Sequence, residues 1–377
     1  MVEEKRESDK NYQDFYKGKN IMITGGMGFI GSSLARRLVD LGSSGLGPER
    51  IVLVDSMIKG NGGNRYNISG IEDKVEVPDM DIGGVDTRNS SKVLKLLYGI
   101  DCIFNLAGSV SHIDSKNRPL RDLELNLESS VSFLESCREY LSREQNEPKL
   151  KIVFSATRDI YGKVKEHNLP VKEDLTVSES ADPQGIHKYA AEFHHLWYGK
   201  TFGFDASSLR VTNTYGPRQQ MKDAQHGFLN WFVRQAIDKE ELQLWGGGVA
   251  LRDFNYIDDV VDAFLMTMAS KNTNNQVYNL GCFIRRDGKY EDVTQSISSV
   301  GEAAKKVVSI AGTGNIKDIP YPEDKKAIEP GHVYLDATKI YEHIGWQPKI
   351  NFDEGIKRTI DFYRKNKQHY WPGKTEE

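Results

Sequence analysis

The stretch KNIMITGGMGFIGSSLARRLVDLG, residues 19–42, decides the fold of this chain of 377 residues. The short apolar run at 21–24 predicts a buried strand, because glycines follow it directly. Beyond the glycines, Leu34, Leu38 and Leu41 recur at helical spacing. A strand, a glycine turn and a helix in this order predict the first unit of a doubly wound parallel sheet.

The same alternation continues to about residue 215. Further strands are predicted at RIVLVD (50–55), KVEVPDMDI (74–82), IDCIFNLAG (100–108), LKIVFSA (150–156) and DASSLRV (205–211). Helices are predicted at about 120–140 and at 183–201. We therefore expect an α/β protein with a Rossmann doubly wound parallel sheet.

Beyond residue 215 the alternation breaks. We predict a Rossmann domain at 19–215, to which 253–281 returns with a helix and a strand. A smaller α/β domain is predicted from 216–252 and 282–370, where HGFLNWFVRQAI, EAAKKVVSIAG and FDEGIKRTIDFYRK favour helices. Residues 1–18 form an N-terminal extension, which is charged and lacks the apolar segment of a signal peptide.

Composition excludes several functional classes. The net charge of −4 favours binding to neither nucleic acid nor an anionic membrane, and no apolar run is long enough to span a bilayer. The three cysteines, Cys102, Cys137 and Cys282, stand far apart without a C-x-x-C pair. We expect buried thiols, no metal site and a cytoplasmic protein.

The glycine turn has the pattern of a dinucleotide site. Gly25, Gly28 and Gly31 let backbone N–H groups approach a pyrophosphate at the start of a helix. Asp55 ends the next predicted strand, where its carboxylate can accept a hydrogen bond from a ribose 2′-hydroxyl. The same charge repels a 2′-phosphate, so the sequence favours NAD over NADP.

Several motifs in order resemble one family. TGGMGFIGSSLARRL, NLAGSVSH, FSATRDIYG, LRVTNTYGPRQ and LRDFNYIDDVVDA resemble the motifs of the extended short-chain dehydrogenase/reductases, in the sugar-nucleotide epimerase and dehydratase group. The resemblance runs from residue 19 to about 364. It implies transient oxidation of a nucleoside-diphosphate sugar by NAD and a homodimer that uses residues near 120–140. We expect a cofactor-binding set of Gly25, Gly28, Phe29, Ile30, Gly31, Asp55, Asp81, Ile82, Leu106, Ala107, Gly108 and Lys188.

The reaction centre departs from the family at one position. By resemblance, Thr157 is the hydroxyl residue, and Lys188 is the lysine that holds the nicotinamide ribose and assists a tyrosine base. The tyrosine position, four residues before the lysine, is Gln184. An amide cannot accept the proton of a sugar hydroxyl, so another group must act as the base.

Two residues are candidates for that base. His187 lies three residues from Gln184, and its ordinary pKa suits proton transfer at neutral pH. Asp159 follows Thr157 by two residues, in a Thr-Arg-Asp run where related 4,6-dehydratases carry Thr-Asp-Glu. The intervening Arg158 is a poor proton donor. We expect the catalytic set to be Thr157, Asp159, Gln184, His187 and Lys188, with His112 as a more distant candidate.

The resemblance also implies residues for the sugar nucleotide. Asn213 and Arg252 match an asparagine and an arginine that contact the diphosphate, and Arg218 is a weaker candidate. Ser109 follows the strand at 100–108, at the edge where α/β proteins bind ligands.

Three functions remain open. The first choice is an NAD-dependent C4 epimerase of a nucleoside-diphosphate sugar. The second is a variant dehydratase in which Asp159 removes the C5 proton. The third is a catalytically silent protein that binds NAD and a sugar nucleotide, for which the missing tyrosine is the argument.

Overall fold

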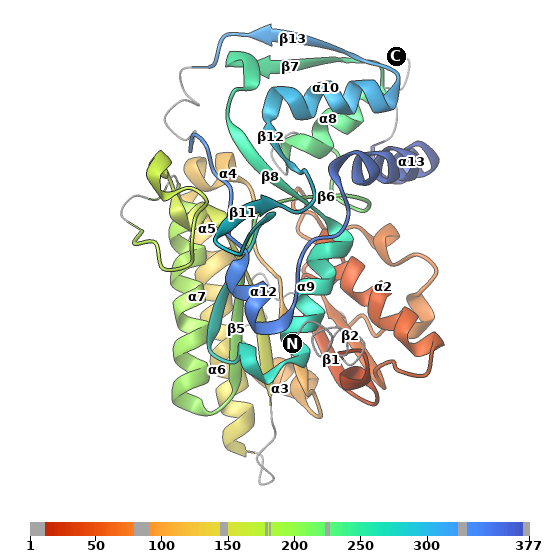
Figure 1. Cartoon of the computed structure of the whole chain (residues 1–377). Helices are drawn as coiled ribbons and strands as arrows, with labels where there is room; N and C mark the ends of the chain where they lie inside the picture. Colours follow the sequence, from red (N-terminus) through yellow and green to blue (C-terminus); the bar gives the residue numbers. More distant parts are fainter. Residues whose placement is uncertain are drawn as a thin grey trace.

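The centre of the molecule is a parallel sheet of six strands in the order β2-β1-β3-β4-β5-β9 (Figure 1). The computed structural model describes residues 12–78, 90–143, 150–177, 180, 182–222, 227–322 and 330–371. The strands of the sheet are β1 (Asn20–Thr24), β2 (Arg50–Val54), β3 (Cys102–Asn105), β4 (Lys151–Thr157), β5 (Asp205–Val211) and β9 (Gln276–Leu280). The chain therefore has the doubly wound Rossmann fold that the sequence predicts.

Both faces of this sheet are covered by helices. Along β1, Ile21 and Ile23 pack into one hydrophobic cluster and Met22 into the other, as expected of a strand buried on both sides. On one face lie α2 (Phe29–Ser43) and α9 (Ile257–Ala269), and on the other lie α3 (Ser90–Leu97), α6 (Ser129–Arg143) and α7 (Pro183–Phe202). The three cysteines are buried thiols.

Two predicted elements differ from the structure. Within residues 74–78 the predicted strand at 74–82 is reduced to one bridge, in which Glu76 pairs with Val52 of β2; residues 79–82 lie outside the described ranges. The helix predicted at about 120–140 begins as α5 (Pro119–Leu123), widens into one π-helical turn at Glu124–Glu128 and continues as α6. Single π-helical turns of this kind are frequent at functional sites.

The C-terminal part builds smaller sheets above the large one (Figure 1). One has the order β12-β8-β6 and another pairs β13 with β7 in parallel, while β10 and β11 form a hairpin. These strands are β6 (Asn213–Tyr215), β7 (Glu241–Trp245), β8 (Leu251–Tyr256), β10 (Phe283–Arg286), β11 (Lys289–Asp292), β12 (Ile297–Ser299) and β13 (Asn315–Ile319). The accompanying helices are α8 (Phe228–Ile237), α10 (Val300–Ala311), α12 (Thr338–Ile344) and α13 (Phe352–Tyr370).

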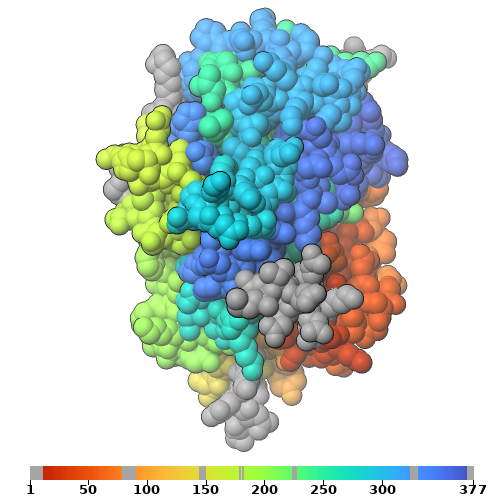
Figure 2. All heavy atoms as spheres, in the orientation of Figure 1, coloured from red at the N-terminus to blue at the C-terminus, as the bar shows by residue number. Residues whose placement is uncertain are grey.

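Distant segments of the chain lie side by side. β9 returns to the large sheet and pairs with β5, and Tyr16 of the N-terminal extension donates a hydrogen bond to Leu265 O in α9 at 2.6 Å. In the space-filling view the blue C-terminal residues lie between the red N-terminal part and the yellow-green segment (Figure 2). The predicted domain boundaries stay a prediction. Among the described helices, none has the length and apolar character needed to cross a bilayer.

Candidate active site

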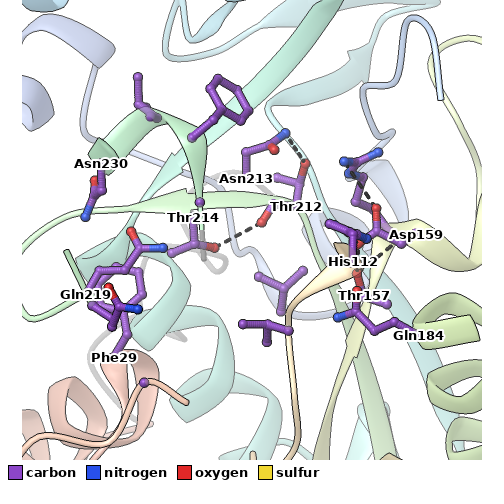
Figure 3. Close-up of a pocket in the computed structure, with 18 of the residues that line it drawn as sticks. Phe29, His112, Thr157, Asp159, Gln184, Thr212, Asn213, Thr214, Gln219 and Asn230 are labelled. Atoms are coloured by element: carbon purple, nitrogen blue, oxygen red, sulfur yellow. Dashed lines mark hydrogen bonds and ion pairs between the residues drawn. The ribbon is translucent and has the colours of Figure 1, made fainter. Parts of the chain in front are cut away.

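A cavity of about 950 Å³ opens at the carboxyl ends of the large sheet, below the smaller sheets. The strands reach it in turn: Gly25 follows β1, Asp55 follows β2, Leu106 follows β3, Thr157 ends β4 and Thr212 follows β5. Parallel sheets bind ligands at this edge. In Figure 3 two groups of polar side chains face each other across the cavity, Gln219 and Asn230 on one side and His112, Thr157, Asp159 and Gln184 on the other.

The glycine turn fits a pyrophosphate. Gly25 has a φ of +67°, which side chains rarely allow, and a Cβ at Gly31 would lie 2.2 Å from the Gly25 carbonyl oxygen. A Cβ at Gly28 would meet only that oxygen, at 3.1 Å, so the remaining space beside Gly28 is open. α2 begins at Phe29, so its free N–H groups face the same space. The residues present therefore fit the dinucleotide that the sequence predicts.

Asp55 is held firmly at the end of β2. Its two carboxylate oxygens accept hydrogen bonds from the backbone N–H groups of Met27 and Met57, both at 2.9 Å. The carboxylate lines the cavity, where a ribose hydroxyl can donate to it. Phe29, Ile30, Leu106, Ala107 and Gly108 also line the cavity. The predicted contacts Asp81 and Ile82 lie outside the described residues.

Lys188 of α7 lines the cavity. Its Nζ donates to Ser155 O at 3.2 Å, and a Cβ at Gly108 would lie 2.9 Å from Nζ, so only glycine allows this approach. Burial lowers the pKa of Lys188 to about 8, although the nearby Asp122 carboxylate acts in the opposite direction. An ammonium group has three N–H donors, so Lys188 can also bind ribose hydroxyl oxygens.

Gln184 occupies the wall beside Lys188 and is almost fully buried. Its Nε2 donates to Ser109 O at 3.3 Å. Its Oε1 is buried without a hydrogen-bond partner among the residues that the structure describes. A buried amide oxygen of this kind is costly unless a ligand or water satisfies it. Gln184 can therefore orient a hydroxyl group, but it carries no proton acceptor of useful strength.

Thr157 and Asp159 form a contact at the end of β4. The Thr157 hydroxyl donates to Asp159 Oδ2 at 2.6 Å, and Arg158 lies 3.1 Å from the other carboxylate oxygen. Burial acts to raise the pKa of Asp159, but the charges of Arg158 and His112 outweigh it and hold the pKa below the ordinary value. Asp159 is therefore an ionised carboxylate at neutral pH.

His112 reaches the same carboxylate from the opposite side. It begins α4 (His112–Asn117), and its Nε2 lies 3.7 Å from Asp159 Oδ2. Its Nδ1 lies 2.5 Å from Oδ2 of Asp182, the residue that caps α7 by accepting the Gly185 N–H at 2.9 Å. Burial lowers the pKa of His112, but the carboxylates of Asp159 and Asp182 outweigh burial, and the net shift is upward.

His187 lies elsewhere. Its Nδ1 is 2.6 Å from Oδ1 of Asp122, and Asp122 Oδ2 accepts from Asn126 Nδ2 at 2.9 Å. This His187–Asp122 pair connects α7 to α5 and the π-helical turn, and His187 is not among the residues that line the cavity. The structure therefore does not bring this predicted catalytic residue together with Thr157 and Asp159.

Two predicted substrate residues line the cavity. Asn213 Nδ2 donates to Asp253 O at 3.1 Å, which fixes the amide at the start of β6. Arg252 is buried, and its guanidinium donates to Leu251 O at 2.8 Å and to Gly331 O. A buried guanidinium at a cavity wall can bind a phosphate oxygen.

The other two predicted substrate residues do not line it. Ser109 is buried, and its backbone N–H donates to Asn126 Oδ1 at 3.0 Å. Arg218 adopts a φ of +76°, and its guanidinium stacks 5.3 Å from the ring centroid of Phe362 in α13. The turn after β6 therefore points this side chain away from the cavity.

Sequence reasoning missed Asp182. The letters DPQG carry a helix-start signal, an aspartate before a proline, which the structure explains as the cap of α7. That signal does not reveal that the second carboxylate oxygen faces a histidine 70 residues earlier. Within the described ranges, no group of three or more His, Cys, Asp and Glu side chains is placed to hold a metal ion.

Comparisons with known proteins identify the family of this chain. Residues 21–281 match the model of the NAD dependent epimerase/dehydratase family. The crystal structure of Thermotoga maritima UDP-glucose 4-epimerase with UDP-glucose is 27% identical, with a TM-score of 0.74, over 92% of this chain and 99% of that one.

Two further proteins show the range of similar activities. The Thermus thermophilus UDP-glucose 4-epimerase in complex with NAD is 27% identical, with a TM-score of 0.72, over 92% of this chain and 99% of that one. A UDP-N-acetyl-alpha-D-glucosaminuronate decarboxylase of Bacillus cytotoxicus is 27% identical over 92% of this chain and 98% of its own length. The chain belongs to the NAD-dependent epimerase/dehydratase family, and it is an NAD-dependent enzyme of nucleotide-sugar modification.

Proposed function

We propose that the enzyme is a C4 epimerase of a nucleoside-diphosphate sugar. The observation that carries the proposal is the 2.6 Å hydrogen bond from the Thr157 hydroxyl to the ionised Asp159, in the cavity that Lys188 also lines. Held at the glycine turn and Lys188, bound NAD would supply hydride transfer from and back to C4 of the sugar. The residues of this chain must therefore remove the proton of the C4 hydroxyl and later replace it.

The Thr157 hydroxyl is suited to pass that proton on. Its hydrogen points to Asp159 Oδ2, and its oxygen accepts the Asp159 backbone N–H at 3.2 Å with one lone pair, so the second lone pair can accept from the sugar hydroxyl. As the sugar proton moves to Thr157 Oγ1, the threonine proton moves to Asp159. Gln184 and Lys188 lie on the same wall, where they hold the sugar and the nicotinamide ribose in place.

Epimerisation needs fewer acid and base groups than elimination. A 4,6-dehydratase must remove a proton from C5 and also protonate the leaving hydroxyl at C6. The Thr-Arg-Asp run carries a single carboxylate, and Arg158 lies against it at 3.1 Å. Arginine stays protonated in proteins and so supplies no proton to a leaving group. A transient 4-keto sugar that rotates in the site and is then reduced on its other face requires only one group that stores the proton.

The experiment follows the products by NMR in deuterated water, with UDP- and GDP-linked hexoses as substrates. Epimerisation through a 4-keto sugar gives the C4 epimer with no deuterium at C5. A 6-deoxy-4-keto product with deuterium at C5 would replace the epimerase by a dehydratase. No turnover over the whole panel, with NAD bound, would favour the silent protein.

One observation favours the dehydratase as the second candidate. The ionised Asp159 and the imidazole of His112 are neighbours with opposite shifts in pKa, the first lowered by Arg158 and His112 against burial, the second raised by carboxylates against burial. Such a pair can provide a base and an acid together. The deuterium experiment decides between the two reactions.

We further propose a homodimer through α7. Ile186, Phe193 and Trp197 are each more than half exposed, and their spacing of seven and four residues places them on one stripe of the helix. Leu120 of α5 is 80% exposed. Light scattering should give twice the mass of one chain, and Trp197→Glu with Phe193→Glu should give a monomer. A wild-type monomer at micromolar concentration would exclude this interface.

A further inference from the structure

The reaction centre contains a histidine between two carboxylates. His112 comes from the start of α4, Asp159 from the segment after β4 and Asp182 from the start of α7, and all three line the cavity. In Figure 3 His112 lies beside Asp159, on the same side of the cavity as Thr157 and Gln184. The group therefore lines the same cavity as Gln184, although its members are scattered along the chain.

The hydrogen bonds fix the tautomer of His112. Asp182 Oδ2 lies 2.5 Å from Nδ1, and a carboxylate can only accept, so Nδ1 carries a proton. In neutral His112 the lone pair is then on Nε2, which faces Asp159 Oδ2 at 3.7 Å. Asp182 is itself held by the Gly185 N–H and is almost fully buried, so the imidazole has a fixed orientation.

Asp159 Oδ2 is the atom that the two neighbours share. It accepts the Thr157 hydroxyl at 2.6 Å and faces His112 Nε2 at 3.7 Å. The three side chains thus form a line from the cavity to Nε2: a hydroxyl, a carboxylate oxygen and an imidazole nitrogen. Asp159 and Arg158 face His112 from the segment after β4, and Asp182 faces it from α7. These are the charged groups that act on the imidazole among the described residues.

We infer that His112, oriented by Asp182, stores the proton of the sugar hydroxyl in place of the absent tyrosine. This inference rests on the proposed function only for the identity of the product. His112 is the final acceptor in oxidation and the first donor in reduction. Asp182 is a positioning residue, because it acts on the substrate only through the imidazole.

The sugar O–H bond breaks and its proton moves to Thr157 Oγ1, the threonine proton moves to Asp159 Oδ2, and a proton passes to His112 Nε2. The O–H electron pair forms the C4 carbonyl, while the C4–H pair leaves as the hydride that NAD accepts. Thr157 and Asp159 thus end the forward step with their starting charges, and His112 ends it as an imidazolium. The return step reverses each transfer and restores neutral His112.

The test measures the oxidation step by itself. Enzyme loaded with NAD is mixed with a nucleotide sugar, and NADH absorbance is followed in a single turnover across pH. His112→Asn keeps a donor for Asp182 but has no titratable nitrogen. We expect its rate of NADH formation to fall by ~10²-fold or more, with NAD content unchanged. His167→Asn, an exposed histidine on the segment Glu166–Asn168, is the matched control and should leave the rate unchanged.

Asp182→Asn separates a positioning role from a merely structural one, because only a positioning role changes the pH dependence of the rate. Asparagine caps helices as well as aspartate does, so α7 should persist. Removing the carboxylate lowers the pKa of His112, so neutral His112 is present at lower pH. In the profile of the NADH formation rate against pH, the acidic limb should shift to lower pH. The NMR signals of the His112 imidazole should also titrate at lower pH.

Each outcome decides the inference. An unchanged rate in His112→Asn, or an unmoved acidic limb and imidazole titration in Asp182→Asn, overturns it. If His112→Asn does not fold, the Asp182→Asn shifts decide alone. If the wild type yields a dehydrated product while both variants behave as expected, the proposed C4 epimerase is wrong and the role of His112 stands.

Discussion

Two histidine–aspartate pairs flank α7, and only one faces the cavity. In the His112–Asp182 pair the second ring nitrogen is directed toward Asp159, while the His187–Asp122 pair joins α7 to α5 and the π-helical turn. The nitrogen–oxygen distances, 2.5 and 2.6 Å, are nearly equal. The contact itself therefore does not identify a proton store. What distinguishes the two is where the remaining ring nitrogen points.

The two pairs also act on different neighbours. Asp182 and Asp159 together raise the pKa of His112 against burial. Asp122 acts on Lys188, whose pKa burial lowers to about 8 and the carboxylate partly restores. The first pair therefore tunes a proton acceptor, and the second supports the lysine that we expect to hold the nicotinamide ribose.

The largest loss of rate is expected at Asp159, which lies between His112 and Thr157. Asp159→Asn keeps the shape of the side chain but removes the charge that accepts the threonine proton. NADH formation in a single turnover should fall by ~10²–10⁴-fold, the usual contribution of a positioned acid or base. NAD content after gel filtration should match the wild type. A rate within a few-fold of the wild type would show that Asp159 is outside the proton path.

Breaking the second pair should affect stability more than proton transfer. His187→Ala leaves the buried Asp122 carboxylate without its histidine partner. The free energy of unfolding in urea should fall by ~1–3 kcal/mol. The acidic limb of the NADH rate should keep its position, because the ring faces away from Asp159. If the acidic limb of the pH–rate profile shifted in His187→Ala and not in the variants of the first pair, the roles of the two pairs would be reversed.

Lys188 is buried near Asp122 of the second pair, and its burial predicts a gain in stability when its charge is removed. Folding lowers its pKa to about 8, so the unfolded chain binds more protons between that value and the ordinary pKa. The free-energy cost of burying the charged Lys188 is therefore at its full value below about pH 8, and it decreases as the pH rises further. Lys188→Met should therefore stabilise the NAD-free protein by ~1–2 kcal/mol at pH 7 and by less at pH 10.

Chemical denaturation at both pH values checks this, with Lys200→Met at the exposed end of α7 as control. The same Lys188→Met protein should retain little NAD. A loss of stability at pH 7 would mean that the hydrogen bond to Ser155 outweighs the cost of burying the charge.

The dinucleotide half of the site was predictable because its signals are local. Gly25, Gly31 and Asp55 lie within two consecutive strands and one helix, and the structure places all three around one space. The contact between His112 and Asp182 was not, because the two residues are 70 positions apart and meet only through the fold. Helix geometry explains why His187 does not line the cavity although Gln184 and Lys188 do. Residue i+4 lies about 40° from residue i around a helix and residue i+3 about 60° to the other side, so Lys188 stays at the cavity while His187 turns to α5.

Substitution of Gln184 should have the smallest effect on the rate, yet it tests most directly whether His112 has replaced the tyrosine. If His112 has replaced the tyrosine, returning a phenol to position 184, beside Lys188, should make His112 less necessary. Gln184→Tyr alone should alter the rate of NADH formation without abolishing it. In the His112→Asn background it should recover the rate several-fold, with the acidic limb moved to higher pH because a phenol has a higher pKa than an imidazole. Gln184→Phe, which has the same ring without the hydroxyl, is the control and should recover nothing. If neither tyrosine variant changes any rate, position 184 is not at the reaction centre. His112 would then line the cavity without taking the place of a lost tyrosine base.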